Sequence, residues 1–341
     1  AAAGPVVGGW IIEHFSWHAA FLMNIPVMAV LLVLAPFFIP ESRNPGHTGV
    51  DVLSSVQSLV AMLTLVFAIK SFAEGTNFPL AYLALAVGLV AGTFFVRRQL
   101  RLPHPMINVR LFRVRAFTGA VLGDLISVFA LIGSLFALTQ YLQLVLGLSP
   151  MVSALWLLPQ TAVSAIAGFL AAWLVRRFSA ALLVSLGTLS AAGGFALLLG
   201  LSTTTEPWVI AAALCLVALG VGIAMTLTHD IIMSSVPPER SGQAAAIGET
   251  AYELGTALGT AVLGSVLLSF YRAGLTESAS GLIGDTLLEQ AGATLAEAIL
   301  VAEQLGGTVG AQLIALAQQE FTTALVITGG CAALLLVGGA I

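Results

Sequence analysis

Long apolar runs occupy most of this chain, and they restrict it to one kind of fold. Crossing the hydrocarbon layer of a bilayer, about 30 Å thick, takes roughly 20 helical residues, and no water is present there to hydrogen-bond free backbone groups. Nine runs of that kind, and the end of a further one at residues 1–12, predict an all-α integral membrane protein. The nine lie at residues 17–39, 52–72, 79–96, 117–139, 150–174, 180–201, 208–234, 243–271 and 321–341.

Composition excludes a soluble domain. Hydrophobic residues make up 59% of the 341 residues and charged residues 8%, against about 25% charged in soluble proteins. Cys215 and Cys331 both lie in apolar runs, which favours packing over a disulfide framework. The pair Gly220 and Gly222 follows no strand, and His, Cys and Asp are not clustered at metal-ligand spacing. We therefore expect no nucleotide, no metal, no cofactor and no nucleic-acid partner.

The basic residues set the orientation across the membrane, because cytoplasmic loops carry an excess of Lys and Arg. If the segment after residue 39 is cytoplasmic, every Lys and Arg except Lys70 and Arg272 falls on the cytoplasmic side. That set is Arg43, Arg97, Arg98, Arg101, Arg110, Arg113, Arg115, Arg176, Arg177 and Arg240. The long acidic segment between Arg272 and Glu320 then lies on the outer side.

That outer segment, residues 276–320, carries apolar residues at helical spacing in two groups, which Gly306 and Gly307 separate. The groups are Leu287, Leu288, Leu295, Ile299 and Leu300, then Leu313, Ile314 and Leu316. The spacing predicts a short helical hairpin on the outer face. A flexible acidic loop is the alternative, because short amphipathic helices need packing to persist.

The run that begins near Gln243 carries two acids where a membrane span avoids them. Glu249 and Glu253 are four residues apart and share one helix face, which Thr256 and Thr260 continue. A rise of about 1.5 Å per residue places Glu253 about 15 Å deep, close to the bilayer midplane. Ionisable residues at that depth are costly and mark ion or substrate paths, so the pair can hold a proton or a cation. A purely structural pair, protonated or bonded to hydroxyl groups, is the alternative.

The opposite face of the same run is made of small residues. Ala251, Gly255 and Gly259 repeat every four residues. This small-xxx-small pattern lets a second helix approach closely. We therefore expect tight helix packing on one side and the two acids on the other.

Two further acids are candidates for the same path. Asp124 lies about two turns into its run and is expected either to face a cavity or to pair locally. Asp230 lies near the cytoplasmic boundary, where snorkelling or pairing is expected rather than substrate binding. The local partners would be Arg113 or Arg115 for Asp124, and Arg176 or Arg240 for Asp230.

Aromatic and amide side chains could line a pocket beside these acids. An aromatic ring binds a desolvated cation with about 1–2 kcal/mol. Trp156, Gln160 and Tyr252 are the residues that we select for this wall. Most other aromatic residues of the chain are expected to be packing residues.

The first residues carry a motif, Gly-Pro-Val-Val-Gly-Gly at positions 4–9, and a Trp-His-Ala-Ala-Phe-Leu-Met-Asn-Ile-Pro stretch follows at 17–26. The first resembles the antiporter motif in the fifth helix of major facilitator superfamily drug exporters. The second resembles that family's approach to helix six, with His18 where Arg is usual. The motif residues are Gly4, Pro5, Gly8 and Gly9. Its glycines permit close packing and its proline a kink, so a gating role and plain helix packing are both open.

Later segments resemble the fourteen-helix drug:proton antiporter group, which contains QacA-like and LfrA-like multidrug efflux pumps. The matching stretches are residues 110–112, 144–150, 157–159 and 242–255. In that scheme residues 1–39 are the last helices of a partial N-terminal bundle, 52–96 two extra central helices, and 117–341 a complete C-terminal six-helix bundle with the outer hairpin. Helices one to four are absent, so we expect a fragment that does not transport by itself.

The resemblance implies a major facilitator fold in the bacterial cytoplasmic membrane, working as a multi-pass monomer. It implies proton-coupled export of lipophilic organic cations such as quaternary ammonium compounds, dyes and drugs, with Glu249 and Glu253 coupling proton to substrate. Ser164 stands where the group has an aspartate associated with divalent cations, which implies monovalent substrates. A symporter, or an exporter of a different small solute, is the alternative within the superfamily, and a receptor or structural role lies outside it. An enzyme is not expected, because no nucleophile or metal constellation is visible.

Overall fold

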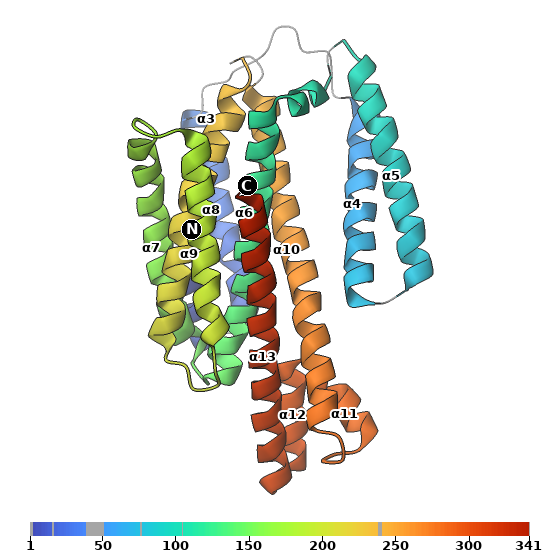
Figure 1. The fold of residues 1–341 in the computed structure, drawn as a ribbon, viewed down its shortest axis with the longest axis vertical. Helices are drawn as coiled ribbons and strands as arrows, with labels where there is room; N and C mark the ends of the chain where they lie inside the picture. Colours follow the sequence, from blue (N-terminus) through green and yellow to red (C-terminus); the bar gives the residue numbers. More distant parts are fainter. Residues whose placement is uncertain are drawn as a thin grey trace.

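The computed structural model is helical throughout the part of the chain that it describes (Figure 1). This part comprises residues 3–15, 17–38, 51–75, 77–103, 105–237 and 241–340, with only the backbone described at 3–6, 17, 20, 73 and 74. Eight of its helices are long and apolar enough to cross a membrane, and none of these residues forms a β-strand. The predicted all-α membrane architecture is confirmed.

The spanning helices match the predicted runs from residue 52 onward. They are α4 (Val52–Glu74), α5 (Phe78–Arg101), α6 (Arg115–Gln140), α7 (Pro150–Leu174), α8 (Ala180–Leu197), α9 (Pro207–Ser234), α10 (Ser241–Ser278) and α13 (Gly307–Gly339). The shorter elements are α1 (Ala3–His14), α2 (Trp17–Leu22), α3 (Asn24–Phe38), α11 (Asp285–Ala291), α12 (Leu295–Leu305), and the turns η1 (Val109–Arg113), η2 (Tyr141–Val145) and η3 (Leu198–Gly200).

The single span predicted at residues 17–39 is wrong, because the structure divides it. Helix α2 ends at Leu22 and α3 begins at Asn24. Pro26 has no N–H to donate to the carbonyl of Leu22, so one continuous helix cannot pass this point without losing a hydrogen bond. The resulting α3 has 15 residues and is shorter than a spanning helix. Residue 39 itself lies outside the described residues.

Six helices, α6 to α10 and α13, pack side by side, and the α4–α5 pair lies next to them with α4 against α10 (Figure 1). Glycines bring several helices into close contact. A Cβ atom at Gly187 of α8 would lie 2.7 Å from the carbonyl oxygen of Gly220 in α9, and one at Gly222 would lie 2.8 Å from Ala167 Cβ in α7. Gly220 and Gly222 are therefore packing residues, as predicted.

The outer segment is folded into helices. Helix α10 continues to Ser278 and α13 begins at Gly307, so both extend past the predicted spans. Helices α11 and α12 connect them, and α12 packs along the first turns of α13, with Gly306 and Gly307 at positive φ in the turn between. The apolar side chains buried here include Leu288, Leu295, Ala298, Val301, Leu313 and Ala317.

The described basic loops lie at the opposite end of the molecule from this segment. The end of α5, the turn η1, the start of α6 and the end of α7 are all at the upper end in Figure 1, while α11 and α12 are at the lower end. Two members of the predicted cytoplasmic set, Arg43 and Arg240, lie outside the described residues. The other members of the set lie at one end of the molecule, because successive spanning helices run in opposite directions.

Candidate functional site

Helix α10 separates its acids from its small residues. Glu249 and Glu253 are exposed, whereas Ala251, Gly255 and Gly259 are buried on the other side. A helix places residues four apart on one face, so this division follows directly from the sequence spacing. The two carboxylates are accessible while the small face is packed.

The small face is held against α6 at near-backbone distance. A Cβ atom at Gly255 would lie 2.7 Å from the carbonyl oxygen of Leu125, and one at Gly259 would overlap the carbonyl of Phe129. From the other side, a Cβ atom at Gly133 would lie 2.5 Å from the Gly259 carbonyl oxygen. Such contact fixes the rotation of α10, and with it the direction in which both glutamates face.

The threonines below the glutamates differ in their bonding. The Thr260 hydroxyl donates to the Thr256 carbonyl at 2.6 Å, so it is satisfied within its own helix. The Thr256 hydroxyl is buried and has no hydrogen-bond partner among the described residues. Of the two threonines, Thr256 is therefore the one whose hydroxyl lacks a partner within the described part of the chain.

Asp124 is fully buried in α6, and its partner comes from another helix. Its Oδ1 lies 3.7 Å from Nδ1 of His229 in α9, and neither carboxylate oxygen has a hydrogen bond to a described residue. The same Nδ1 lies 3.0 Å from the carbonyl oxygen of Met225. Among the described residues Asp124 makes no ion pair with Arg113 or Arg115, so the predicted local pairing is replaced by an interhelical one.

Helix α10 lies beside the pair of Asp124 and His229, next to the residue that precedes Glu249. A Cβ atom at Gly248 would lie 3.9 Å from Nε2 of His229, so the imidazole lies against α10 one residue before Glu249. Sequence reasoning missed His229 because it looked for metal-ligand spacing, whereas the contact joins residues far apart in the chain.

The other predicted residues are more scattered. Asp230 is exposed and makes no ion pair with a described residue, and Arg240 lies outside that part of the chain. Gln160 is buried in α7, while Trp156 in α7 and Tyr252 in α10 are half-buried. Helix α7 packs against α9 and α1, and α10 against α6, α13 and α4. The two α7 side chains and Tyr252 therefore lie on helices that share no extended interface.

The N-terminal motif lies in α1, which packs against α7. Gly9 makes the close contact, since a Cβ atom there would lie 3.2 Å from the carbonyl oxygen of Pro150. Gly8 was also expected to permit close helix packing, but nothing lies within 4 Å of its Cβ position. For Gly4 and Pro5 only the backbone is described, and it belongs to α1.

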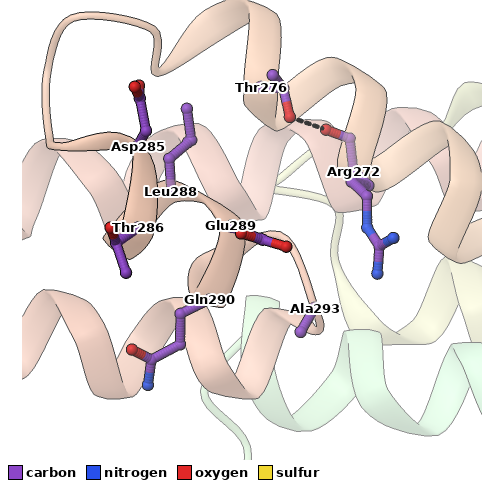
Figure 2. A pocket seen from close by; sticks show the side chains of 8 residues that line it. All are labelled: Arg272, Thr276, Asp285, Thr286, Leu288, Glu289, Gln290 and Ala293. Carbon is purple, nitrogen blue, oxygen red and sulfur yellow. Dashed lines mark hydrogen bonds between the residues drawn. The ribbon is translucent and has the colours of Figure 1, made fainter.

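An open hollow of about 740 Å³ lies at the outer end, between the last turns of α10 and helix α11 (Figure 2). Arg272, Thr276, Asp285 and Glu289 are among the residues that line it, and the Thr276 hydroxyl donates to the Arg272 carbonyl at 2.7 Å. None of the predicted site residues lines this hollow. Within the described part of the chain, no group of three or more His, Cys, Asp or Glu residues is placed to hold a metal ion.

A sequence model of the major facilitator superfamily matches residues 1–260. The chain belongs to this superfamily. It is 39% identical over 346 residues to the multidrug efflux pump LfrA of Mycolicibacterium smegmatis, covering 100% of this chain and 67% of LfrA. It is 30% identical over 348 residues to the methyl viologen resistance protein SmvA of Salmonella typhimurium, covering 99% of this chain and 69% of SmvA.

A further relative is the multidrug resistance protein Stp of Mycobacterium tuberculosis, 32% identical over 278 residues, 80% of this chain and 51% of Stp. A solved structure of similar fold is the inward-facing, unoccupied bacterial homologue of the lysosomal transporter Spinster. Its TM-score is 0.52 at 16% identity, over 84% of this chain and 68% of that one. This major facilitator chain is thus a transporter rather than an enzyme, related to multidrug efflux pumps. With its apolar helices it is a multi-pass protein of the bacterial cytoplasmic membrane.

Proposed function

We propose that the protein is a proton-coupled antiporter that exports lipophilic, monovalent organic cations, acting as a monomer, with Glu249 and Glu253 as coupling residues. The observation that carries the proposal is the pair of accessible carboxylates on a spanning helix whose other face is locked to α6. Relatives named as multidrug efflux pumps and resistance proteins support the transport class.

The lack of a built-in counter-charge favours a cationic ligand. Helix α10 carries no Lys or Arg before Arg272, and neither glutamate makes an ion pair with a described residue. A carboxylate away from bulk water is stabilised by a proton or by a cation, and by little else. Proton and drug therefore compete for one charge site.

That competition gives the transport cycle. In the inward-facing state the deprotonated glutamates attract a hydrophobic cation from the cytoplasm. Because α10 is packed tightly on α6, the two helices move as one unit when the bundles rock about the membrane midplane. Protonation from the outer side then displaces the drug, and the proton is released inward on the return. No phosphate chemistry is required.

The test is ethidium efflux from cells that express the full-length gene product with Glu253→Gln or Glu249→Gln. We expect the efflux rate to fall by roughly 10-fold or more, because the neutral amide neither attracts the cation nor carries a proton. Glu277→Gln is the matched control, since Glu277 is an exposed acid near the outer end of the same helix. Equal efflux in wild type and both test variants would remove the coupling role from these residues.

The preference for monovalent cations is tested separately. Ser164 is exposed on α7 and supplies no second charge there. We expect ethidium, a monocation, to be exported and methyl viologen, a dication, to be exported much more slowly in the same assay. One relative is named a methyl viologen resistance protein, so methyl viologen is the dication most suited to test whether the preference exists. Equal export of the two would refute the monovalent preference and leave the antiport mechanism standing.

A further inference from the structure

The buried carboxylate of Asp124 is not explained by drug binding at Glu249 and Glu253. It is fully buried in α6, and neither of its oxygens has a hydrogen bond to a described residue. A buried carboxylate without partners is destabilising unless a nearby group compensates its charge. The imidazole of His229, 3.7 Å away, is placed to be that group.

The contacts of His229 assign different roles to its two nitrogens. Nδ1 lies 3.0 Å from the Met225 carbonyl oxygen, which can only accept, so Nδ1 carries a hydrogen and donates it. Nε2 then has the free lone pair, and it lies 3.9 Å from the Cβ position of Gly248 in α10, the residue before Glu249. The imidazole therefore keeps one nitrogen hydrogen-bonded within α9 and leaves the other on the side of α10.

Few other charges face this group. From α10 the acids are Glu249 and, one turn deeper, Glu253, and α9 adds the exposed Asp230. Helix α8 carries no Asp, Glu, His, Lys or Arg, and the one such residue of α13 is Glu320, which lies against Gly274 toward the outer end. Among the described residues, the ionisable side chain in contact with Asp124 is that of His229.

The level of the group in the membrane suits release to the cytoplasm. Asp124 is nine residues into α6 and Glu249 eight residues into α10, which is about 12–14 Å from the end where the basic loops lie. His229 is five residues from the end of α9, and its side chain is 44% exposed, so the described helices do not enclose the ring. Glu249 is exposed as well.

We propose that His229 is the proton-release group of the transport cycle and that Asp124 is a positioning residue that stabilises its charged form. This inference rests on the proposed proton antiport. Glu249 gives up one proton through water, Nε2 of His229 accepts it, and the resulting imidazolium is stabilised by the Asp124 carboxylate. Nε2 then releases the proton to cytoplasmic water, while Nδ1 keeps its hydrogen bond to Met225. Histidine suits this step because one ring nitrogen can take up and release a proton while the other keeps its hydrogen bond.

The experiment separates proton release from drug movement, using the full-length protein in proteoliposomes. One measurement is ethidium transport driven by a pH gradient, which requires the proton to leave in every cycle. The other is exchange of labelled for unlabelled drug at equal pH on both sides, which involves only drug-bound states. His229→Asn retains a donor for the Met225 carbonyl but cannot carry a proton. We expect its gradient-driven transport to fall by roughly 10-fold or more, with exchange within about twofold of wild type.

A double variant separates the loss of proton release from the loss of a folded protein. Removing His229 alone leaves a buried carboxylate uncompensated, whereas His229→Asn with Asp124→Asn removes both charges. Because the two residues act as one unit, we expect the double variant to be no slower than His229→Asn alone. Loss of exchange together with gradient-driven transport, in single and double variants alike, would show a structural role and overturn the proposal.

Glu253→Gln distinguishes this failure from failure of the proposed function. If Glu253→Gln transports normally, the antiport proposal fails, and proton release through His229 fails with it. If Glu253→Gln loses transport while His229→Asn keeps the wild-type rate in both measurements, the antiport proposal stands and the role of His229 alone is refuted.

Discussion

Gly259 leaves no room for a side chain where α10 crosses α6, because a Cβ atom would overlap the Phe129 carbonyl. Gly264, further along the same helix, has nothing within 4 Å of its Cβ position. We expect Gly259→Ala to lower the free energy of unfolding by about 1–3 kcal/mol, since the obstructing atom belongs to the backbone and cannot move aside. Gly264→Ala is the matched control and is expected to be neutral or slightly stabilising.

Thermal denaturation of the detergent-solubilised protein, followed by size-exclusion chromatography, measures both effects. The Gly259 variant should lose its monodisperse peak several degrees below wild type. If both alanine variants melt together with wild type, the contact between α6 and α10 is looser than described, and the fixed orientation of the two glutamates loses its physical basis.

Single residues also show where sequence reasoning stops. The spacing of Glu249, Glu253, Gly255 and Gly259 was enough to predict which face of α10 packs and which is free, because periodicity is a local property. The partner of Asp124 could not be obtained in this way. Contact with His229 depends on how α6 and α9 are placed by their shared neighbours, and no spacing in the sequence encodes that placement.

At the scale of elements, α4 and α5 are joined by a polar cluster at the end of the molecule where the basic loops lie. Asp51 caps α4 by accepting from the Ser54 amide, and Arg98 of α5 binds the same carboxylate at 3.0 Å. The Gln99 side chain donates to the Ser54 hydroxyl at 2.7 Å. The pKa of Asp51 is lowered to about 2, mainly by the hydrogen bond from the Arg98 guanidinium and next by that from the Ser54 hydroxyl.

A depressed pKa in the folded state fixes the sign of the pH dependence. The stabilisation from Asp51 is complete above its unfolded pKa of 3.8 and is lost as the pH falls through about 2. Asp51→Asn should therefore speed amide hydrogen exchange at the start of α4 and the end of α5 by a constant factor between about pH 8 and 5, and the difference should shrink below about pH 4. Asp285→Asn, at the outer end, serves as the control. A difference that grows as the pH falls would contradict this assignment.

Element boundaries were predictable where polar chemistry marks them. Helix α7 begins at the predicted residue because Ser149 caps it and Pro150 is its first residue. Hydropathy did not predict the C-terminal end of α10 or the start of α13, because both helices continue beyond their apolar runs. Backbone hydrogen bonding does not stop at the membrane surface, and the buried apolar side chains of α12 support the extra turns. Hydropathy also predicted one span where the structure has α2 and α3, because hydropathy does not reflect the backbone hydrogen bond that Pro26 cannot make.

At the scale of the whole molecule, the described basic loops and the α11–α12 segment lie at opposite ends (Figure 1). An excess of Lys and Arg marks the cytoplasmic side, so the end that holds Arg98, Arg113 and Arg177 should face the cytoplasm. The hollow beside Arg272 should then face outward. This orientation decides which way a proton leaves from His229, which lies near the basic end of α9.

Cysteine labelling in spheroplasts tests this orientation. Cys215 and Cys331 are free thiols, so both are first replaced by Ala, and a single cysteine is introduced as Ser280→Cys or Ser234→Cys. Both serines are exposed, the first next to α11 and the second at the end of α9. A membrane-impermeant maleimide should label Ser280→Cys in intact spheroplasts and Ser234→Cys only after permeabilisation. The reverse pattern would place His229 at the outer surface, where it would take up the proton instead of releasing it.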